Sequence, residues 1–238
     1  MITKLNKKSE RGTADFGWLK ANFSFSFGNY FNPNKIQFGA LRVLNDDLIA
    51  AGMGFGTHPH ENMEIITIPL EGGLRHRDSM GNEAVVRFGE VQVMSAGTGI
   101  EHSEMNPSKT EPAKTLQLWV FPEKQNVTPR YDQKSFDLES KINTFVNVVS
   151  PNDKNDGNAL WVYQQTFFNL GIFEENKTIN YKVNIPKNGV YLFLIEGEIE
   201  VNNAVANERD AIEIVDFHEF EIKINKKSKI LLIEVPMQ

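Results

Sequence analysis

Cysteine is absent from this chain of 238 residues, and its absence narrows the available chemistry. Disulfide bonds and thiolate ligands are excluded, so any metal site must use His, Asp or Glu. No stretch approaches the roughly 18 uninterrupted apolar residues of a membrane span. The opening MITKLNKKSERGTADFGW also lacks the apolar core of a secretory signal. These absences favour a cytoplasmic protein with no membrane association.

Positive charge is also in short supply. The chain has 25 Lys and Arg against 31 Asp and Glu, for a formal net charge of -6. A broad nucleic-acid-binding surface needs clustered Lys and Arg, so direct binding of nucleic acid is not expected. With 40% hydrophobic and 24% charged residues, the composition is ordinary for one large globular domain or two small ones.

Continuous helical periodicity is hard to find. Residues 132–145 are a candidate for a short helix or a connecting segment. Elsewhere, short runs rich in β-branched and aromatic residues recur between turn signals, including EIITIPL, VQVMS, LQLWVF, GVYLFLIEG and KILLIEV. Such runs are typical of strands in a sandwich or barrel. We therefore predict an all-β fold.

A faint internal repeat divides the chain. The segment ITIPLEGGLRHRD (66–78) resembles YLFLIEGEIEVNN (191–203), with Gly72 aligned to Gly197 at an offset of 125 residues. Farther on, GEVQVMSAG (89–97) resembles RDAIEIVDF (209–217) at an offset of 120 residues. Two related barrels in tandem would explain both matches. We place the first domain at residues 1–132 and the second at residues 133–238.

Two histidines lie one residue apart in GMGFGTHPHENMEII (52–66), and a second pair of potential ligands follows in IEHSEMN. These pairs are His58 with His60, and His102 with Glu104. Alternate residues of a strand point to the same face, so two such pairs on neighbouring strands can converge on one ion. Three imidazoles and a carboxylate suit divalent iron, manganese, nickel or copper, whereas closed structural zinc sites favour cysteine. The alternative is a β protein whose histidines are paired by chance.

The repeat provides an internal comparison for these four candidates. At the two offsets they correspond to aliphatic residues, namely Val183, Ile185, Ile222 and Ile224. A barrel without an ion fills its interior with apolar side chains. The sequence thus predicts one metal, in the N-terminal half. His76 is a candidate for the pocket mouth, with a solvated strand histidine as the favoured interpretation. His218 is interpreted as a surface or structural residue.

Several motifs together resemble the pirin family of bicupins. They are RGTADFGWLKANFSFSFGNYFNPNKIQFGALRVLNDD, GFGTHPHENMEI, LEGGLRHRDSMGN and MSAGTGIEHSEMN. The resemblance is dense from Arg11 to Tyr131, whereas the C-terminal half matches only in general pattern. It is especially close to bacterial pirin-like proteins with quercetinase activity. It implies two cupin barrels facing each other, the first holding a metal and the second lacking ligands.

The resemblance also implies a ligand set and a metal. His58, His60, His102 and Glu104 carry the family pattern, and Glu64 is a reserve because many cupins use a Glu shortly after the first histidine pair. The expected metal is Fe(II), with Mn, Ni, Cu, Co or Zn as alternatives.

The activity implied by the resemblance is oxidative ring opening of a flavonol such as quercetin by dioxygen, with release of carbon monoxide. Glu104 would act as the general base. The alternative, also drawn from the family, is a non-enzymatic iron-binding regulatory or redox-sensing protein that acts through a protein partner.

Aromatic residues around the expected site have two interpretations. Phe55, Trp119 and Phe121 are candidates to line a pocket, although strand aromatics are more often core. The run FSFSFGNYF (23–31) is interpreted as a buried strand or as interdomain packing, with a ligand role as the less favoured alternative.

Overall fold

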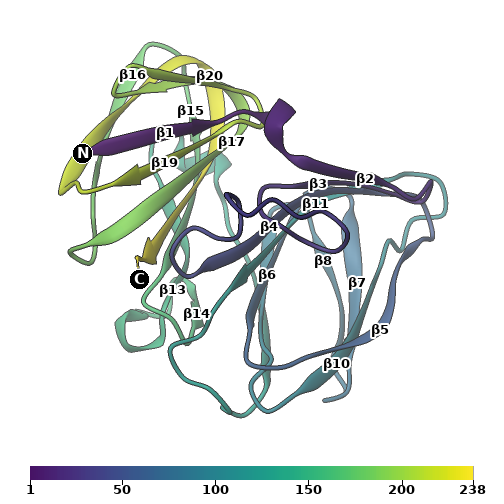
Figure 1. The fold of residues 1–238 in the computed structure, drawn as a ribbon. Helices are drawn as coiled ribbons and strands as arrows, with labels where there is room; N and C mark the ends of the chain where they lie inside the picture. Colours follow the sequence, from purple (N-terminus) through teal and green to yellow (C-terminus); the bar gives the residue numbers. More distant parts are fainter. Residues whose placement is uncertain (238) are drawn as a thin grey trace.

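The protein is described by a computed structural model of residues 1–237, and it consists of two β-barrels (Figure 1). Its helical segments in these residues are three short 3₁₀ turns: η1 (Lys8–Glu10), η2 (Glu139–Lys141) and η3 (Asn152–Lys154). The predicted all-β fold of two cupin barrels is confirmed. Of the two alternatives for residues 132–145, the connecting segment is the correct one: strand β12 (Arg130–Ser135) ends at Ser135, and the 3₁₀ turn η2 follows.

The N-terminal barrel is formed by a sheet of seven strands and a sheet of four. The larger sheet has the order β12 (Arg130–Ser135), β9 (Glu90–Ser95), β6 (Glu64–Glu71), β11 (Ala113–Val120), β4 (Leu41–Ile49), β3 (Leu19–Phe23) and β2 (Gly12–Asp15). The smaller sheet has the order β5 (Gly54–His60), β10 (Ile100–Met105), β7 (Gly73–Asp78) and β8 (Glu83–Arg87).

The C-terminal barrel is formed by the third sheet, which has nine strands. Its main path is β1 (Ile2–Asn6), β19 (Ala211–Val215), β17 (Asn188–Val201), β20 (Glu219–Pro236), β15 (Phe167–Phe173), β13 (Val146–Pro151) and β14 (Leu160–Val162). Two further strands pair outside this path: β16 (Lys177–Lys182) with β20, and β18 (Ala204–Asn207) with β17.

The N-terminal strand β1 pairs with β19 of the other half, antiparallel from Ile2 opposite Val215 to Asn6 opposite Ala211. Figure 1 shows this purple strand lying across the C-terminal barrel. At the predicted boundary between the two domains, β12 pairs with β9 of the N-terminal sheet and continues to Ser135. The boundary at residues 132 and 133 stays a prediction. Strand β12 extends across it, and β1 pairs with a strand of the other half.

The largest apolar core lies between the two barrels. In β6, Ile66 and Ile68 face this core, whereas the adjacent Ile65 packs in a separate cluster inside the N-terminal barrel. Across the interface, Leu231 and Ile233 of β20 belong to the same core. Both faces of β6 are therefore buried, which explains why its sequence is a continuous apolar run. Burial of each such side chain contributes about 1.5–3 kcal/mol.

The repeat is visible in the backbone at its glycines. Gly72 and Gly197 both adopt a left-handed conformation, with φ of 70° and 99°. A side chain at Gly197 would also collide with Ser228 and with the carbonyl of Lys227. Because only glycine adopts this conformation without steric cost, the Glu-Gly motif marks the same bend in both barrels.

The predicted alignment of His58 and His60 with the second half of the chain is displaced by four residues. His58 lies opposite His102 in the pairing of β5 with β10, and Ile179 lies opposite Ile222 in the pairing of β16 with β20. By the same comparison, Tyr181 takes the place of His60. The predicted counterparts Val183 and Ile185 are wrong because the connection after β16 is longer than the one after β5.

The interior of the second barrel is apolar. Its core includes Leu192, Leu194 and Ile212, together with Ile222 and Ile224, which lie in the positions of His102 and Glu104. Among residues 1–237, a convergent group of candidate metal ligands occurs in the N-terminal half alone. Residues 152–159, which connect β13 to β14, also lie inside this second unit.

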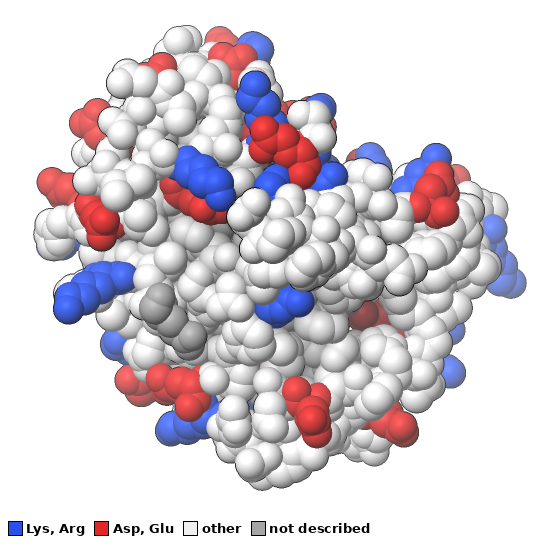
Figure 2. All heavy atoms as spheres, viewed as in Figure 1, with Lys and Arg blue, Asp and Glu red and all other residues white. Residues whose placement is uncertain are grey.

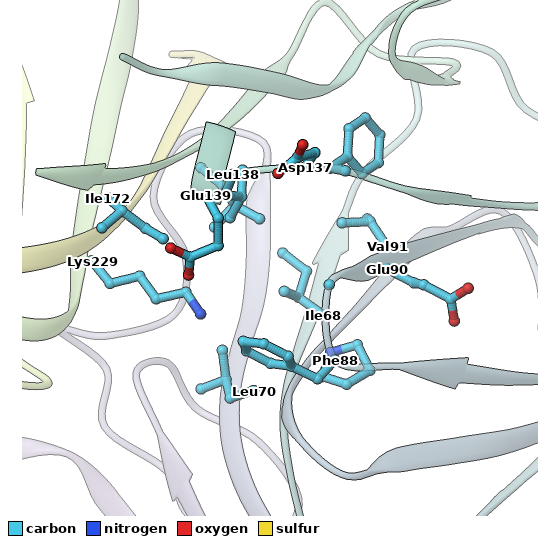
Figure 3. A pocket seen from close by; sticks show the side chains of 14 residues that line it. Ile68, Leu70, Phe88, Glu90, Val91, Asp137, Leu138, Glu139, Ile172 and Lys229 are labelled. Atoms are coloured by element: carbon cyan, nitrogen blue, oxygen red, sulfur yellow. The ribbon is translucent and has the colours of Figure 1, made fainter. Parts of the chain in front are cut away.

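A small apolar cavity of about 120 Å³ lies between the barrels (Figure 3). Ile68 and Leu70 of β6 line it from one side, and Leu170 and Ile172 of β15 line it from the other. The Lys229 side chain lies at its margin, with Nζ 4.5 Å from the centre of the Phe88 ring. The cavity contains no histidine and is separate from the site described below.

The molecular surface carries both signs of charge. Figure 2 shows acidic and basic side chains interspersed on the visible face, with wide uncharged areas between them. Within residues 1–237, no helix has the length and apolar character needed to cross a membrane.

Candidate metal centre

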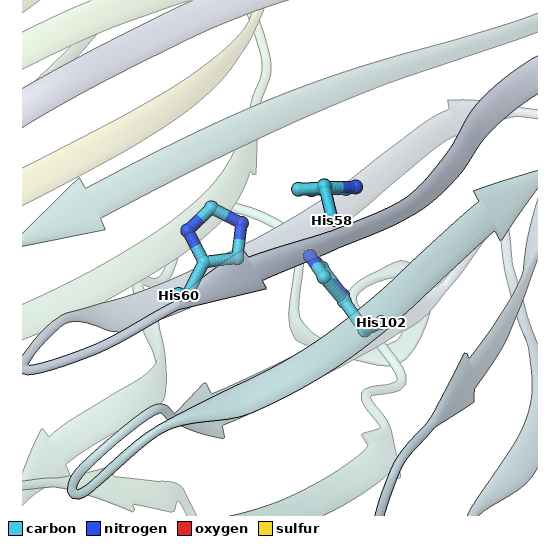
Figure 4. Close-up of side chains that lie close together, drawn as sticks. All are labelled: His58, His60 and His102. Carbon is cyan, nitrogen blue, oxygen red and sulfur yellow. The ribbon is translucent and has the colours of Figure 1, made fainter.

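Three histidines converge at one side of the N-terminal barrel. His58 and His60 occupy alternate positions of β5, and His102 lies directly opposite His58 on the neighbouring strand β10. Potential ligand atoms of the three side chains lie within 4.8 Å of one another. Figure 4 shows the three rings turned toward a common point. The predicted convergence of two strand pairs is therefore seen for the histidines.

The ring nitrogens fit a metal ion. Nδ1 of His58 lies 2.7 Å from the carbonyl oxygen of Gly56 and donates to it, which leaves Nε2 with a free lone pair. Nε2 of His102 is buried and has no hydrogen-bond partner among the described residues. Buried polar atoms without partners are rare, and a metal ion at the centre of the three rings would satisfy this nitrogen.

The local environment keeps His60 and His102 neutral. Burial, together with the neighbouring His58, lowers the pKa of His60 to about 4. Burial also lowers the pKa of His102 to about 3, with additional contributions from His58 and His60. Neutral imidazole is the form that binds metal, so His60 and His102 are ready for an ion at neutral pH without first losing protons.

Acidification should destabilise the metal-free protein through this cluster. The pKa of His60 is lower in the folded protein than the roughly 6.5 of an unfolded chain. Its contribution is thus complete above pH 6.5 and is lost as the pH falls toward 4. Between pH 7 and pH 5, the wild type should lose about 1 kcal/mol more unfolding free energy than His60→Gln, after discounting for partial exposure.

Urea unfolding of both proteins in chelator measures this difference. Comparison with His60→Gln cancels the opposite contributions of Asp47 and Glu64, whose pKa values burial raises to about 8 and about 7. Equal losses in both proteins would contradict the prediction.

Glu104 is close to the cluster but is held by protein partners. It is 2% exposed, and its Oε2 accepts a hydrogen bond of 2.6 Å from Nε2 of Gln117. Oε1 accepts from the Thr67 hydroxyl at 3.3 Å. A bulge in the pairing with β5 lies between His102 and Glu104. The role of Glu104 as a fourth ligand stays a prediction, whereas burial clearly raises its pKa.

The prediction of Glu64 as a reserve metal ligand is wrong. Its Oε2 accepts from the Ser95 hydroxyl at 2.7 Å, and the backbone of Tyr163 in the C-terminal half also bonds to its carboxylate. Glu64 lies two residues before Ile66, on the face of β6 that packs toward the other barrel. Its carboxylate therefore points away from the histidines.

His76 is a candidate site residue that the sequence interpretation missed. The predicted solvated histidine is only 1% exposed. Its Nδ1 lies 3.5 Å from Nδ1 of His102, its Nε2 lies 3.0 Å from Oδ2 of Asp78, and its ring stacks on Tyr131 at 4.5 Å. The signal was present in LRHRDS, where His76 and Asp78 form a third i, i+2 pair on a strand next to His102. In contrast, His218 is exposed, as predicted.

Replacing His76 with Phe should weaken metal binding by about 10- to 100-fold, because groups that orient a ligating histidine typically contribute this much. Competition with a chromophoric chelator measures the dissociation constant. The matched control is His218→Phe, which changes the same residue type at an exposed position and should bind metal normally. Unchanged affinity in His76→Phe would contradict a positioning role.

Aromatic side chains of the N-terminal half pack beside the histidine cluster. The Trp119 ring packs edge-on against His60 with centroids 4.8 Å apart, and Phe27 packs against Trp119 at 5.3 Å. Phe121 follows the end of β11, where its carbonyl accepts a hydrogen bond from Gln164 of the C-terminal half. Of the predicted lining residues, Trp119 contacts a ligand candidate directly.

A histidine cluster in one cupin barrel and an apolar second barrel define a bicupin with a single candidate metal centre. The family model described as Pirin matches residues 4–120, and the model of the quercetinase C-terminal cupin domain matches residues 147–235. The chain belongs to the pirin family.

Similarity to curated and solved relatives extends over the whole chain. A quercetin 2,3-dioxygenase of Escherichia coli K12 is 41% identical over 98% of each chain. The crystal structure of YhhW from Escherichia coli has a TM-score of 0.94 at 41% identity, covering 100% of this chain and 99% of that one. The nickel(II) complex of the bacterial pirin YhhW has a TM-score of 0.93 at 40% identity over the full length of both chains.

Proposed function

We propose that this protein is a metal-dependent dioxygenase that opens the heterocyclic ring of a flavonol such as quercetin. Two oxygen atoms of dioxygen enter the products, which are carbon monoxide and a depside ester. The observation that carries the proposal is the unpartnered Nε2 of His102 close to the imidazoles of His58 and His60. Similarity over 98% of the chain to a protein named quercetin 2,3-dioxygenase supports the choice of reaction.

His58, His60 and His102 would hold the metal. A divalent ion there supplies Lewis acidity that lowers the pKa of the flavonol 3-hydroxyl. The three imidazoles would contribute no charge of their own to the ion, so any compensating charge would have to come from Glu104 or from the substrate. Fe(II) is the proposed ion, and the nickel(II) complex of a relative supports a site for divalent metals more generally.

Glu104 is proposed as the fourth ligand or as the base that accepts the 3-hydroxyl proton. Burial raises the pKa of Glu104, and a carboxylate with a raised pKa is a better proton acceptor. Its hydrogen bonds from Gln117 and Thr67 fix the orientation of the carboxylate. Trp119 and Phe27 provide apolar surface beside His60, which suits a flat aromatic substrate.

The test is aerobic consumption of quercetin by iron-reconstituted protein, with carbon monoxide detected and metal content measured. We expect turnover that depends on the metal and is lost in His60→Ala together with the metal. The exposed change His218→Ala should leave both unaffected. Protein with stoichiometric metal but no quercetin consumption would refute the proposed reaction.

A further inference from the structure

An aromatic hollow of about 400 Å³ opens beside the candidate metal centre, between strands β2–β5 and the loop after β3. Its walls include the rings of Phe23, Phe27, Tyr30 and Phe55. This volume lies within the roughly 300–1,000 Å³ typical of small-molecule sites. The rings suit a flat aromatic molecule.

The hollow adjoins the site through two of its walls. Phe55 precedes His58 by three residues on β5 and lies opposite Glu104 in the strand pairing. Phe27 contacts Trp119, which in turn contacts His60. A ligand with one end near the histidines can therefore extend its other end between these two aromatic walls.

The interpretation of the aromatic run 23–31 as a buried strand or as interdomain packing is confirmed, since Phe23 is buried in β3. Phe25 packs in the core between the barrels, with its ring 5.4 Å from that of Tyr191. Phe23 and Phe27 instead contact each other at 5.6 Å and line the hollow. Tyr30 of the same run also lines the hollow, so the less favoured alternative, a ligand role, stays a proposal for three aromatic residues of the run.

Two polar side chains of β4, Asn45 and Asp47, line the same hollow from alternate strand positions. They are 3% and 4% exposed. Oδ1 of each is buried and has no hydrogen-bond partner among the residues that the structure describes. Such orphaned atoms are rare because each unmade hydrogen bond costs free energy, so their presence in a hollow indicates a ligand group that completes them.

The charged residues around Asp47 determine which kind of ligand group can bind beside it. The charged groups that act on it are Asp46 and Glu104, both acidic, and burial together with these neighbours raises the pKa of Asp47 to about 8. The two basic residues nearest Asp46, Arg11 and Arg209, are paired with its carboxylate at 3.5 and 3.1 Å. An anionic ligand group is disfavoured here. A neutral hydroxyl fits because it can both donate and accept a hydrogen bond.

We infer that this hollow binds the hydroxylated aromatic ring of the substrate that lies remote from the reacting ring, with Asn45 and Asp47 as its specificity-determining residues. The inference rests on the proposed function, since it names the part of the substrate that the same site recognises. The substrate class is thereby narrowed to aromatic 3-hydroxy ketones that carry further, uncharged hydroxyl groups on a second ring.

The experiment compares quercetin with 3,5,7-trihydroxyflavone, which retains the reacting group and the hydroxyls of the fused ring but has no hydroxyl on the remote ring. For the metal-loaded wild type, kcat/KM should favour quercetin by at least about tenfold, the worth of one or two completed hydrogen bonds. In Asp47→Leu this preference should fall by about tenfold. Asp47→Asn is the matched control: it retains a polar side chain of the same shape and should retain the preference.

Asn45→Leu gives a second and independent variant if Asp47→Leu fails to fold. A preference that is equal in the wild type and in the folded leucine variants would overturn the inference and leave the proposed function intact.

Failure of the proposed function itself is recognised separately. If the metal-loaded wild type consumes neither flavonol, the proposed reaction is refuted. The inference about the hollow is then tested by measuring anaerobic binding of the two compounds through tryptophan fluorescence. Preferential binding of quercetin that disappears in Asp47→Leu would support the hollow as a hydroxyl-recognition site. Equal binding of both compounds by all variants would overturn it.

Discussion

Replacing Glu104 with Gln should lower kcat for flavonol consumption by at least about 100-fold, because general-base groups typically contribute 10²–10⁴-fold. Glutamine has nearly the same shape and can still accept the hydrogen bond that Gln117 donates at 2.6 Å. It cannot take up a proton at neutral pH. The fold should therefore persist while proton transfer from the substrate 3-hydroxyl is lost.

Metal content separates the two roles proposed for Glu104. Loss of kcat with metal retained identifies a base, whereas loss of both identifies a ligand. Steady-state kinetics normalised to bound metal, together with chelator competition, distinguish these results. A variant that keeps more than a tenth of the wild-type kcat would contradict both roles.

Glu64→Gln provides a matched control for this measurement. Glu64 is 1% exposed, and burial raises its pKa to about 7, so its environment resembles that of Glu104. Its carboxylate nevertheless bonds to Ser95 on the side of the barrel away from the histidines. A comparable loss of kcat in Glu64→Gln would show that removal of a buried acid acts through the fold and not through the site.

The convergence of the histidines could be predicted because it depends on local geometry. Alternate residues of a strand share a face, and no knowledge of distant contacts is needed to pair His58 with His60. The recurrence of the pattern at His102 supplied the neighbouring strand. The alternation does not extend to Glu64, which the cupin pattern alone suggested, since residues 61–63 leave the strand and the positive φ of 46° at Asn62 lies within that turn. Alternation cannot be counted across such a break.

Other features were not predictable from local patterns because they depend on long-range pairing. His76 is buried because β7 pairs with β10 on one side and Tyr131 of β12 covers its ring. The assignment of β1 to the sheet of the C-terminal half joins residues more than 200 positions apart, from Ile2 to Val215. Neither contact leaves a periodic signal in a single sequence.

The second large effect should come from a carboxylate in the metal-free barrel. Glu234 is fully buried, and its carboxylate accepts hydrogen bonds from the Tyr181 hydroxyl at 2.7 Å and from the Asn188 side chain at 3.0 Å. It also accepts from the backbone N–H groups of Asn184 and Ile185 at 2.9 and 3.0 Å, and from the Asn184 side chain at 2.8 Å. These bonds fasten the segment between β16 and β17 to β20.

Replacing Glu234 with Leu should lower the free energy of unfolding by about 3–5 kcal/mol, since it leaves several buried donors without an acceptor. Urea unfolding of the metal-free protein at pH 7 measures the loss. Glu219→Leu is the control on the same strand: Glu219 is exposed, and surface substitutions usually change stability by less than about 0.5 kcal/mol. A loss below 1 kcal/mol in Glu234→Leu would contradict the prediction.

The position of Glu234 also allows a test of coupling between the barrels. It lies between Ile233 and Val235, which pack in the core shared by both halves together with Ile66 and Leu118 of the N-terminal barrel. Because this core is continuous, Glu234→Leu should lower the unfolding midpoint of both barrels together, although it lies in the half without histidines. Metal release and loss of β-structure should then occur in a single transition in the metal-loaded variant. Two separate transitions, with metal retained through the first, would show that the N-terminal barrel keeps its site without the second.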